Sequence, residues 1–538
     1  MSPALDLKTY TMKILNILIF LTFSNLIYSQ TINFSGTISQ DTDWNYDTVK
    51  IIGNVDITSG STLKIRSGTI IQFQGNFMIS SVGRIIAIGE KDKNIVFTIN
   101  DTTGFSSNNG NVGWAGIKLL YPWDGGNYGY LDTNDSSFFK HCTLEFSRNG
   151  ALIIENFSKV KISNCNISNN YGSSGAGINT SFSNCLIDSC SFFNNYSYNY
   201  GGAIYISDDT YSSPSYYPRI TNSFFINNHG SHGGAIDYSG YIYLVGNVFS
   251  HNSTYHGGAI QFWGVNGIIA NNIICNNTAV YGGGAIMGGG NNSDLLMANN
   301  TICNNKAEYA PGIYLDYENY EFINNIVWNN KATRQDSLQI YLFLPGTIIN
   351  VFNCLIEDYA SYNSSTFNMD VNNITGNPSF FNPTDSLIYD PDEIFKNWSL
   401  NSGSMCIDNG INVYNNYTNF SLPYDISGKN RKCNNTIDIG ALEHQTSNTF
   451  SEDFNHLKNH IEIFPNPSYG IIYIKLNEKR AVHSGFQIKI FNSSGNLVYY
   501  DESVKNMIEK IDISKSKGLN LVEVMSDGNI YTRKVVIN

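Results

Sequence analysis

Charged residues are scarce in this chain of 538 residues, and basic ones are nearly absent from its middle. Charged side chains make up 14% of the sequence, and between residues 162 and 330 the only basic ones are Arg219 and Lys306. The formal net charge is −12, a sign that repels the phosphate backbone of nucleic acids. We therefore expect no nucleic-acid partner. A lyase that binds acidic polysaccharides is also disfavoured, because it needs cations for the uronate carboxylates and a basic group for the α-proton.

Motifs of several common protein classes are also missing. The sequence has no Cys/His spacing of a zinc site, no Walker loop and no dinucleotide-binding fingerprint. It lacks the Ala/Glu/Lys/Leu periodicity of helical proteins, whereas Gly, Asn and β-branched residues are abundant. Hydrophobic residues still reach 42%, enough for a packed core, and the length favours several domains or a solenoid. These observations predict an all-β fold.

The N-terminus carries the one long apolar run. Lys13 precedes an apolar stretch from Ile14 to Leu21, and the small residue Ser29 suits a cleavage site before Gln30. This arrangement predicts a secretory signal peptide over residues 1–29. The alternative is a membrane anchor, but the run is short and interrupted. We therefore expect an exported protein that has no transmembrane helix once the signal is removed.

Two sequence marks repeat in phase through the middle of the chain. Gly-Gly-Ala-Ile occurs four times, with its isoleucines 24 to 32 residues apart, at residues 201–204, 233–236, 257–260 and 283–286. An Asn-Asn pair follows an apolar run at residues 169–170, 194–195, 227–228, 276–277, 304–305 and 329–330, and His251-Asn252 occupies the same place in the remaining repeat. Short alternating runs between these marks are typical of strands, and the interval leaves no room for helices. Each repeat therefore predicts one coil of about three strands, stacked on the next at ~4.8 Å with its asparagines in ladders.

This pattern resembles the secreted right-handed parallel β-helix family over roughly residues 45 to 370. The resemblance implies an all-β fold, with a right-handed parallel β-helix over residues 30–375 followed by a small C-terminal β-sandwich. It does not imply one function, because the family includes lyases, hydrolases and adhesins.

Residues 376–445 depart from the repeat. The stretches 403–410, 425–431 and 437–443 resemble the segment called choice-of-anchor Q, which follows β-helices on exported proteins. We expect it to cap the last coil, whose strand edges would otherwise be open. Its acids could hold calcium, or they could cap turns and pair with Arg431 and Lys429. The acids concerned are Asp408, Asp425, Asp438 and Glu443.

A polar linker over residues 446–459 leads to a final domain at residues 460–538. Five to seven short alternating runs there fit a small β-sandwich. The domain resembles the Por (type IX) secretion C-terminal sorting domain of Bacteroidota, although Asn520 stands where that family has tyrosine. The resemblance implies type IX machinery as a partner and passage across the outer membrane to the cell surface or beyond. The matching motif positions are Pro465, Asn466, Pro467, Gly495, Gly518 and Lys534.

The nine cysteines predict ladders more than disulfides. Aligning the repeats puts Cys142, Cys165 and Cys190 in one column, and Cys354 has the same place in its repeat. Parallel Cβ atoms ~4.8 Å apart lie beyond the usual span of a disulfide. We expect these thiols to be reduced and buried, and we predict one disulfide, between Cys406 and Cys433.

Outward positions after Gly-Gly-Ala-Ile are where a pair of catalytic carboxylates would lie on this fold. Neither outward column offers the adjacent acids that a glycosidase needs. Asp237 stands alone, which predicts an exposed, solvated side chain. The two columns read Tyr205, Asp237, Gln261, Met287 and Tyr314, and Ser207, Ser239, Trp263, Gly289 and Asp316.

Histidine and aromatic residues supply the remaining site candidates. His232 and His256 both precede Gly-Gly, which predicts a structural ladder, with a metal site as the weaker alternative. Aromatic rings stack on sugars and polar side chains hydrogen-bond to them, although tyrosine-rich loops can also pack their own stems. The glycan-contact candidates are Trp123, Tyr128, Tyr205, Tyr216, Asp237, Gln261 and Trp263.

We therefore predict a monomeric, non-catalytic, adhesin-like protein that presents a rigid face to neutral glycans or other surfaces. It is expected to need no cofactor unless calcium binds. The alternative is a carbohydrate-active enzyme, a hydrolase or lyase acting on an extracellular polysaccharide.

Overall fold

The fold was analysed in a computed structural model of the full chain. It forms two compact units, residues 1–444 and 445–538, which are described separately. The predicted signal peptide, the predicted linker and several loops lie outside the described residues. The structure describes residues 30–106, 112–120, 136–157, 159–183, 185–207, 218–264, 266–290, 294–316, 319–334, 338–361, 366–412, 420–433, 436–445, 461–464, 468, 470–476, 486–492, 496–504, 508–526 and 529–537.

The first unit is a right-handed parallel β-helix, as the repeat predicted. One coil shows the design: it runs through β24 (Ile242–Val245), β25 (Val248–Ser250), β26 (Ser253–His256) and β27 (Ile260–Trp263). Each strand pairs in parallel with its equivalent one coil later. The coil therefore has four faces, one more than expected, because the segment between the Asn pair and Gly-Gly also pairs as a strand. We call these the first to fourth faces, in the order of these four strands.

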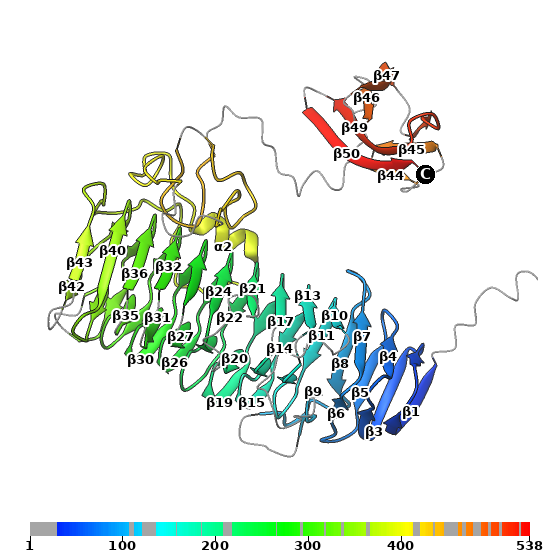
Figure 1. The fold of residues 1–538 in the computed structure, drawn as a ribbon, viewed down its shortest axis with the longest axis horizontal. Helices are drawn as coiled ribbons and strands as arrows, with labels where there is room; N and C mark the ends of the chain where they lie inside the picture. Colours follow the sequence, from blue (N-terminus) through cyan, green and yellow to red (C-terminus); the bar gives the residue numbers. More distant parts are fainter. Residues whose placement is uncertain are drawn as a thin grey trace, which may run out of the picture. The chain divides into compact units, whose positions relative to one another are not determined.

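Strands of the first and second faces run the length of the stack, from the blue N-terminal end to the yellow-green end in Figure 1. The first face contains β2 (Thr42–Trp44), β4 (Thr62–Ile65), β7 (Arg84–Ile88), β10 (Ser137–Lys140), β13 (Val160–Ser163), β17 (Cys185–Asp188), β21 (Arg219–Thr221), β24, β28 (Gly267–Ala270), β32 (Asp294–Ala298), β36 (Asn319–Ile323), β40 (Ile348–Phe352) and β43 (Thr366–Met369). The second contains β1 (Thr31–Ile38), β3 (Thr48–Ile57), β5 (Ile70–Phe73), β8 (Ile95–Ile99), β11 (Cys142–Glu145), β14 (Asn166–Ser168), β18 (Ser191–Phe193), β22 (Phe224–Ile226), β25, β29 (Ile273–Cys275), β33 (Thr301–Cys303), β37 (Ile326–Trp328) and β41 (Leu355–Ile356).

The third face has strands in only part of the stack, whereas the fourth again runs along its length. The third contains β15 (Tyr171–Ser174), β19 (Tyr196–Tyr200), β26, β30 (Thr278–Gly282), β34 (Lys306–Ala307) and β38 (Lys331–Ala332). The fourth continues from the end of β3 through β6 (Ile79–Ser81), β9 (Ile117–Leu120), β12 (Leu152–Glu155), β16 (Ile178–Ser181), β20 (Ile204–Ser207), β23 (Ile236–Ser239), β27, β31 (Ile286–Gly289), β35 (Ile313–Leu315), β39 (Ile340–Leu342) and β42 (Tyr359–Ser361).

Identical side chains stacked from coil to coil build the core. Phe192, Phe225 and Phe249 are buried, and their rings stack in sequence with centroids 4.7 and 4.8 Å apart. The isoleucine of each Gly-Gly-Ala-Ile motif is likewise fully buried. Such same-face pairs are the unit of sheet stabilisation, so a fixed repeat length gives a continuous core.

The predicted asparagine ladder forms the corner between the second and third faces. The first residue of each pair takes a left-handed backbone conformation, as at Asn276 with φ 59°, and the second is buried. Asn252 Nδ2 and its backbone N–H both donate to Asn277 Oδ1, at 2.9 Å each. Equivalent bonds link Asn170, Asn195, Asn228, Asn252, Asn277, Asn305 and Asn330.

A second ladder, not predicted, forms the corner between the first and second faces. Asn247 Nδ2 donates to the carbonyl oxygen of Ile220 in the preceding coil, at 2.9 Å, and Cys190 Sγ donates equivalently to Ile162 at 3.6 Å. Cysteine and asparagine thus both donate a hydrogen bond to the preceding coil from equivalent positions of one column. This explains the predicted cysteine column: all nine thiols are unbridged, and all but Cys433 are buried. The predicted Cys406–Cys433 disulfide is wrong, because Cys406 packs in an apolar cluster against the second face.

Glycine pairs make the corner between the third and fourth faces. Gly257 has φ +66°, and a Cβ on Gly258 would overlap the carbonyl oxygen of Gly284 in the next coil. Two glycines in sequence are therefore required here by backbone conformation and by close approach.

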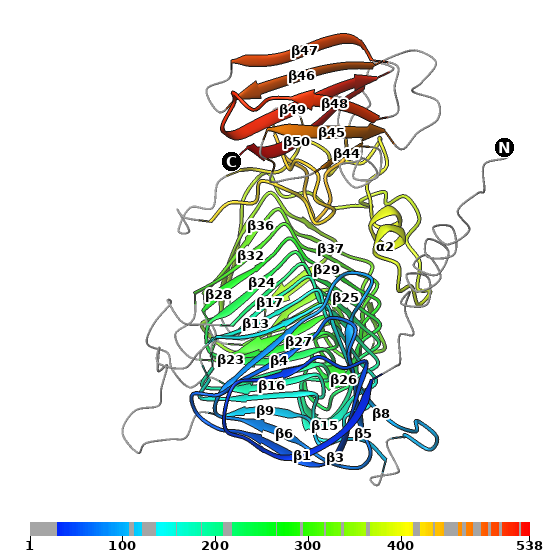
Figure 2. The same ribbon diagram turned by 90° about the vertical axis from the view of Figure 1, so that its right-hand side faces the viewer.

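Residues 376–444, which we call the flank segment, lie along the side of the solenoid. The segment includes α2 (Pro391–Asn397), drawn beside the second face in Figure 2. Its buried residues Ile394, Trp398 and Leu400 pack against outward apolar residues of the second face, such as Ile273 and Ile326. Polar bonds reach both edges of this face: Tyr389 Oη donates to Asn194, and Asn353 Nδ2 donates to Asn409 O. The described contacts of the segment therefore run along the second face up to the last complete coil, because outward apolar side chains make this face a surface that needs covering. Capping of the end of the last coil stays a prediction.

The C-terminal unit consists of two small antiparallel sheets. Residues such as Ile472, Ile488, Val522 and Val535 are buried between them. One sheet contains β44 (Ile461–Phe464), β45 (Ile471–Leu476) and β48 (Ile508–Asp512). The other contains β46 (Phe486–Asn492), β47 (Leu497–Val504), β49 (Gly518–Ser526) and β50 (Asn529–Ile537).

Candidate functional site

A column of aromatic and imidazole rings runs along the third face, beside the glycine corner. We call it the ring column: Tyr200, His232, His256, Tyr281 and Tyr309, with successive centroids 5.3, 5.5, 5.2 and 5.1 Å apart. Four of these residues precede the corner in their own coil. Tyr281 fills the place beside Gly282, which has no side chain. Coil stacking therefore builds a continuous row of rings from residues far apart in sequence.

Outward residues of the fourth face form the opposite side of the glycine corner. Strand register places Tyr205, Asp237, Gln261, Met287 and Tyr314 in adjacent coils, in the order predicted. Tyr205 reaches across the corner, and its ring stacks on Tyr200 with centroids 5.3 Å apart. We call the ring column, these outward residues and Trp263, the next outward residue of β27 after Gln261, together the aromatic corner.

Asp237 is buried in the aromatic corner without a charged partner. The side chain is 4% exposed, so the expectation of a solvated carboxylate is wrong. Its Oδ2 atom is shielded from solvent and accepts no hydrogen bond from the described residues, none of whose ion pairs includes Asp237. Burial raises the pKa of Asp237 to about 8. The carboxyl group is therefore mostly protonated at neutral pH.

Gln261 and Trp263 form a fixed pair one coil further along. With the Gln261 amide oriented to suit its neighbours, its nitrogen donates to His256 O at 3.2 Å and its oxygen accepts from Trp263 Nε1 at 2.8 Å. The indole is nevertheless 45% exposed. Its neighbours in the adjacent coils are Ser239 and Gly289, so no large side chain stands beside it in its column. Trp263 is thus an exposed aromatic platform whose orientation is fixed by a hydrogen bond.

Asp316 lies beyond Gly289 in the same outward column as Trp263. A Cβ on Gly289 would stand 2.9 Å from the Cβ of Asp316, so only glycine leaves room for this acid. Burial raises the pKa of Asp316 to about 6. Asp237 and Asp316 are three coils apart, roughly 14 Å at ~4.8 Å per coil. They cannot act as the close carboxylate pair of a glycosidase, which is ~5–10 Å apart.

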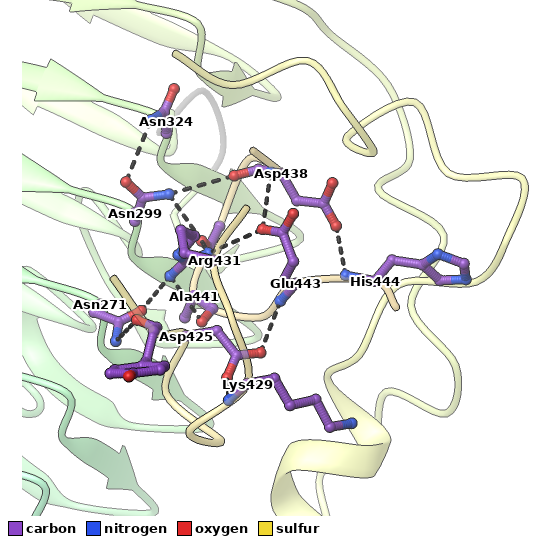
Figure 3. Close-up of polar contacts among 12 residues, drawn as sticks. Asn271, Asn299, Asn324, Asp425, Lys429, Arg431, Asp438, Ala441, Glu443 and His444 are labelled. Atoms are coloured by element: carbon purple, nitrogen blue, oxygen red, sulfur yellow. Dashed lines mark hydrogen bonds and ion pairs between the residues drawn. The ribbon is translucent and has the colours of Figure 1, made fainter. Parts of the chain in front are cut away.

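Acids of the flank segment have a different environment, shown in Figure 3. Asp438 accepts backbone N–H bonds from Asp408 at 2.8 Å and His444 at 2.6 Å, and Asp425 accepts from Lys429 and Glu443. The Glu443 carboxylate accepts from Asp438 N at 3.0 Å, and its Oε2 lies 3.8 Å from Arg431. These contacts agree with the expectation that the acids cap turns and pair with Arg431, which was the alternative to calcium binding.

Arg431 is the centre of this polar cluster and is 1% exposed. Its guanidinium donates to the carbonyls of Gly440 and Ala441, at 2.8 and 3.0 Å, and to Asn271 Oδ1 of the solenoid (Figure 3). Because of these bonds, the cluster attaches the flank segment to the solenoid. Within the residues that the structure describes, no group of three or more His, Cys, Asp or Glu side chains is arranged to hold a metal ion.

His232 and His256 lie as the ladder interpretation predicted. Their rings stack with an interplanar angle of 25° and centroids 5.5 Å apart. Burial lowers the pKa of both imidazoles, so they are neutral at neutral pH.

Of the predicted glycan-contact residues, four meet in one place and three lie outside the described part of the chain. Tyr205, Asp237, Gln261 and Trp263 belong to adjacent coils, whereas Trp123, Tyr128 and Tyr216 fall in undescribed loops. Sequence reasoning missed Tyr200, Tyr281 and Tyr309 in the ring column. The signal for Tyr200 and Tyr309 was present, because both occupy the position before the corner that drew attention to His232 and His256.

Residues 462–538 match the family described as the secretion system C-terminal sorting domain. The protein is exported by type IX secretion. This sorting domain implies interaction with the type IX machinery and export across the outer membrane to the cell surface or the medium. In the described chain, no helix has the length and hydrophobicity needed to cross a membrane.

Other comparisons say less about this type IX substrate. A search of curated proteins finds no match. The solved structures include a similar chain, the crystal structure of tailspike protein 3 of bacteriophage CBA120, at 12% identity and a TM-score of 0.27. The alignment covers 65% of this chain and 55% of the tailspike, so the chain spans about half of that protein's length.

The motif positions of the sorting domain are partly described. Gly518 begins β49 with φ +91°, and Lys534 lies in β50 paired with Leu521. Pro465, Asn466, Pro467 and Gly495 lie outside the described residues. Asn520 is buried, and its Nδ2 donates to Ser516 O at 2.7 Å.

Proposed function

We propose that this exported protein is a non-catalytic binder of neutral glycans and that the aromatic corner is its binding surface. The observation that carries the proposal is the continuous ring column, which lies beside an exposed, hydrogen-bonded Trp263. Neighbouring rings of the column pack against one another, stacked at His232–His256, edge to face at His256–Tyr281 and tilted at the other two contacts. A ligand on this surface would therefore meet ring edges, hydroxyls and ring nitrogens as well as ring faces. Trp263 offers the complementary contact, an aromatic surface on which a sugar can stack.

A neutral ligand fits the charges of this surface. Coils from residue 162 to residue 305 contain one basic residue, Arg219, whose guanidinium lies over the Tyr243 ring on the first face, 4.9 Å from its centroid. His232 and His256 are neutral, and Asp237 is mostly protonated at pH 7. Around His232, Asp237 and Trp263, an acidic polysaccharide would find no cation and a cationic ligand would find no ionised acid. The charged groups lie towards the other end of the corner, where Arg334 stands over the Tyr309 ring, 4.6 Å from its centroid, and Asp316, with a pKa of about 6, is mostly ionised at pH 7.

Rigidity also favours binding over catalysis. Every member of the aromatic corner is held by a coil that pairs on both sides, so little conformational entropy is lost when a ligand binds. Catalysis of glycoside hydrolysis needs two carboxyl groups close together, and Asp237 and Asp316, the acids of the two outward columns at this corner, are three coils apart.

The test is a polysaccharide panel probed with the full-length secreted protein. The panel holds neutral cello-, xylo-, manno- and laminari-oligosaccharides, with polygalacturonate and alginate as acidic comparators. Binding and newly released reducing or unsaturated ends are read in the same wells. We expect binding to a neutral glycan with no release of ends, whereas release from any polymer would show an enzyme and contradict the proposal.

A further inference from the structure

Among the described residues of the aromatic corner, Asp237 has the one carboxyl group. It lies beside the ring column, between the candidate sugar contacts Tyr205 and Gln261. Tyr205 of β20 lies on one side of it and Gln261 of β27 on the other, in register. His232 belongs to the same coil, with Tyr200 and His256 before and after it in the ring column. No lysine or arginine occurs between residues 220 and 305. The carboxyl group is therefore surrounded by neutral groups.

The hydrogen-bonding capacity of this group is not used within the described protein. Oδ2 is buried and accepts nothing, and the only upward influence on the pKa of Asp237 is its burial. A protonated carboxyl group is a strong hydrogen-bond donor, and a buried polar group without a partner costs free energy. Rotation about the Cβ–Cγ bond exchanges its two oxygens, so the hydroxyl can turn toward a ligand. Unsatisfied buried acids of this kind are concentrated at functional sites.

We propose that Asp237 is the specificity residue of the aromatic corner: in its neutral form it donates a hydrogen bond to a hydroxyl or ring oxygen of a bound glycan. The inference rests on the proposed function, because it names the group that recognises the ligand at that surface. A ligand acceptor satisfies Asp237, whereas ionisation converts the donor into an acceptor with a negative charge. Binding therefore belongs to the protonated form and weakens as the pH rises.

Two substitutions separate the donor role from a packing role. Asp237→Asn keeps the shape and an N–H donor but cannot ionise, and Asp237→Leu removes the donor from a similar volume. Asp56→Asn is the matched control, because Asp56 is an exposed acid on β3, far from this corner in the stack.

The experiment measures affinity for cellohexaose and mannohexaose from pH 6 to pH 10 by calorimetry, using full-length secreted protein. We expect the wild type and Asp56→Asn to lose at least tenfold in affinity between pH 7 and pH 10. Asp237→Asn should keep its pH 7 affinity across this range, and Asp237→Leu should bind at least tenfold more weakly than wild type at pH 7. Circular dichroism at each pH confirms that all variants are folded.

The outcomes distinguish the two proposals. If the wild type binds but its affinity is flat with pH, or if Asp237→Leu binds like wild type, the role of Asp237 is overturned and the glycan-binding function stands. If Asp237→Asn loses the affinity that the wild type has, the carboxyl group acts by another chemistry and the inference also fails. If the wild type binds no glycan of the panel at any pH, both proposals are overturned.

Discussion

Buried aspartates on two faces of the same solenoid have different environments. On the second face, Asp425 and Asp438 of the flank segment accept backbone N–H bonds on both carboxylate oxygens, and Arg431 lies among them. On the fourth face, Asp237 is as buried, but none of the described groups hydrogen-bonds to its Oδ2 atom. The comparison teaches that burial alone does not mark a functional acid. Lack of a hydrogen bond alone does not mark one either, because Glu443 of the flank cluster also has a buried oxygen without a partner and a pKa that burial raises to about 8, yet it lies 3.8 Å from Arg431. Asp237 differs because it has no charged partner among the described residues and lies beside exposed aromatic rings, where a ligand can satisfy it.

The aromatic residues differ between the faces in the same way. On the covered side, aromatic residues such as Trp398 and Phe380 pack edge to face in the apolar cluster, with centroids 5.3 Å apart. At the aromatic corner, Trp263 is held by one hydrogen bond and stays 45% exposed. The first arrangement attaches a segment, and the second leaves a surface open.

The largest effect should come from breaking the attachment of the flank segment. Arg431→Ala leaves Glu443 without its positive neighbour and removes the bonds to Gly440, Ala441 and Asn271. Removing one partner of a buried charged cluster costs about 3–5 kcal/mol. Urea denaturation should therefore show this loss, while Lys429→Ala, an exposed neighbour, should change stability by less than ~0.5 kcal/mol. Equal losses in the two variants would contradict a structural role for the cluster.

The glycine corner below the ring column should be nearly as sensitive. In Gly258→Ala the new Cβ overlaps the Gly284 carbonyl oxygen, so stacked coils must move apart. We expect a loss of about 3 kcal/mol, the upper part of the usual cost of overpacking. Gly403→Ala is the control, because nothing lies within 4 Å of a Cβ at that position. A Gly258→Ala protein as stable as this control in thermal unfolding would show that close approach does not set the corner.

A smaller effect, of opposite sign, is expected at Asp237. Its folded pKa of about 8 lies above the ordinary aspartate pKa of 3.8, so the folded state binds this proton more tightly. The stability that this proton contributes is fully present below pH ~4 and is lost as the pH rises to about 8, at no more than ~1.4 kcal/mol per unit. Asp237→Asn removes this loss, so we expect it to stabilise the protein by about 2 kcal/mol at pH 7, well below that limit. Denaturation at pH 4 and pH 7 checks the sign: a variant stabilised equally at both would contradict the shift.

The smallest effect on stability should be that of Trp263→Ala. The indole is half exposed and has small neighbours, so its removal should change the free energy of unfolding by less than ~1 kcal/mol. Thermal unfolding measures this directly. A loss of several kcal/mol would mean that Trp263 packs the fold and would weaken its assignment to ligand binding.

Much of the fold could be predicted because equivalent positions of successive repeats lie next to one another in the stack. Spacing of Gly-Gly-Ala-Ile placed Tyr205, Asp237 and Gln261 in adjacent coils, and the register confirms that placement. The cysteine column followed from the same alignment. The reason for it, that cysteine replaces asparagine as a donor to the preceding coil, became visible only from the hydrogen bonds of Asn247 and Cys190.

What the sequence could not give was how deeply a side chain is buried and what covers a face. Strand alternation places the Asp237 side chain outward, yet neighbouring residues bury it. Alternation predicts only which way a side chain points and says nothing of residues that pack against it from across a corner. Outward apolar residues such as Ile273 and Ile326 showed only an unusually hydrophobic strand; the flank segment that covers them comes from more than 50 residues later in the chain.

The most direct test of the account compares two aromatic residues of similar exposure, one from each region. Trp263 of the aromatic corner is 45% exposed, and Tyr424 of the flank segment is 55% exposed. Affinity of Trp263→Ala and Tyr424→Ala proteins for cellohexaose and mannohexaose is measured at pH 7 beside the wild type. We expect at least a tenfold loss for Trp263→Ala and no change for Tyr424→Ala. A loss confined to Tyr424→Ala, or wild-type affinity in Trp263→Ala, would contradict the claim that the aromatic corner binds the ligand.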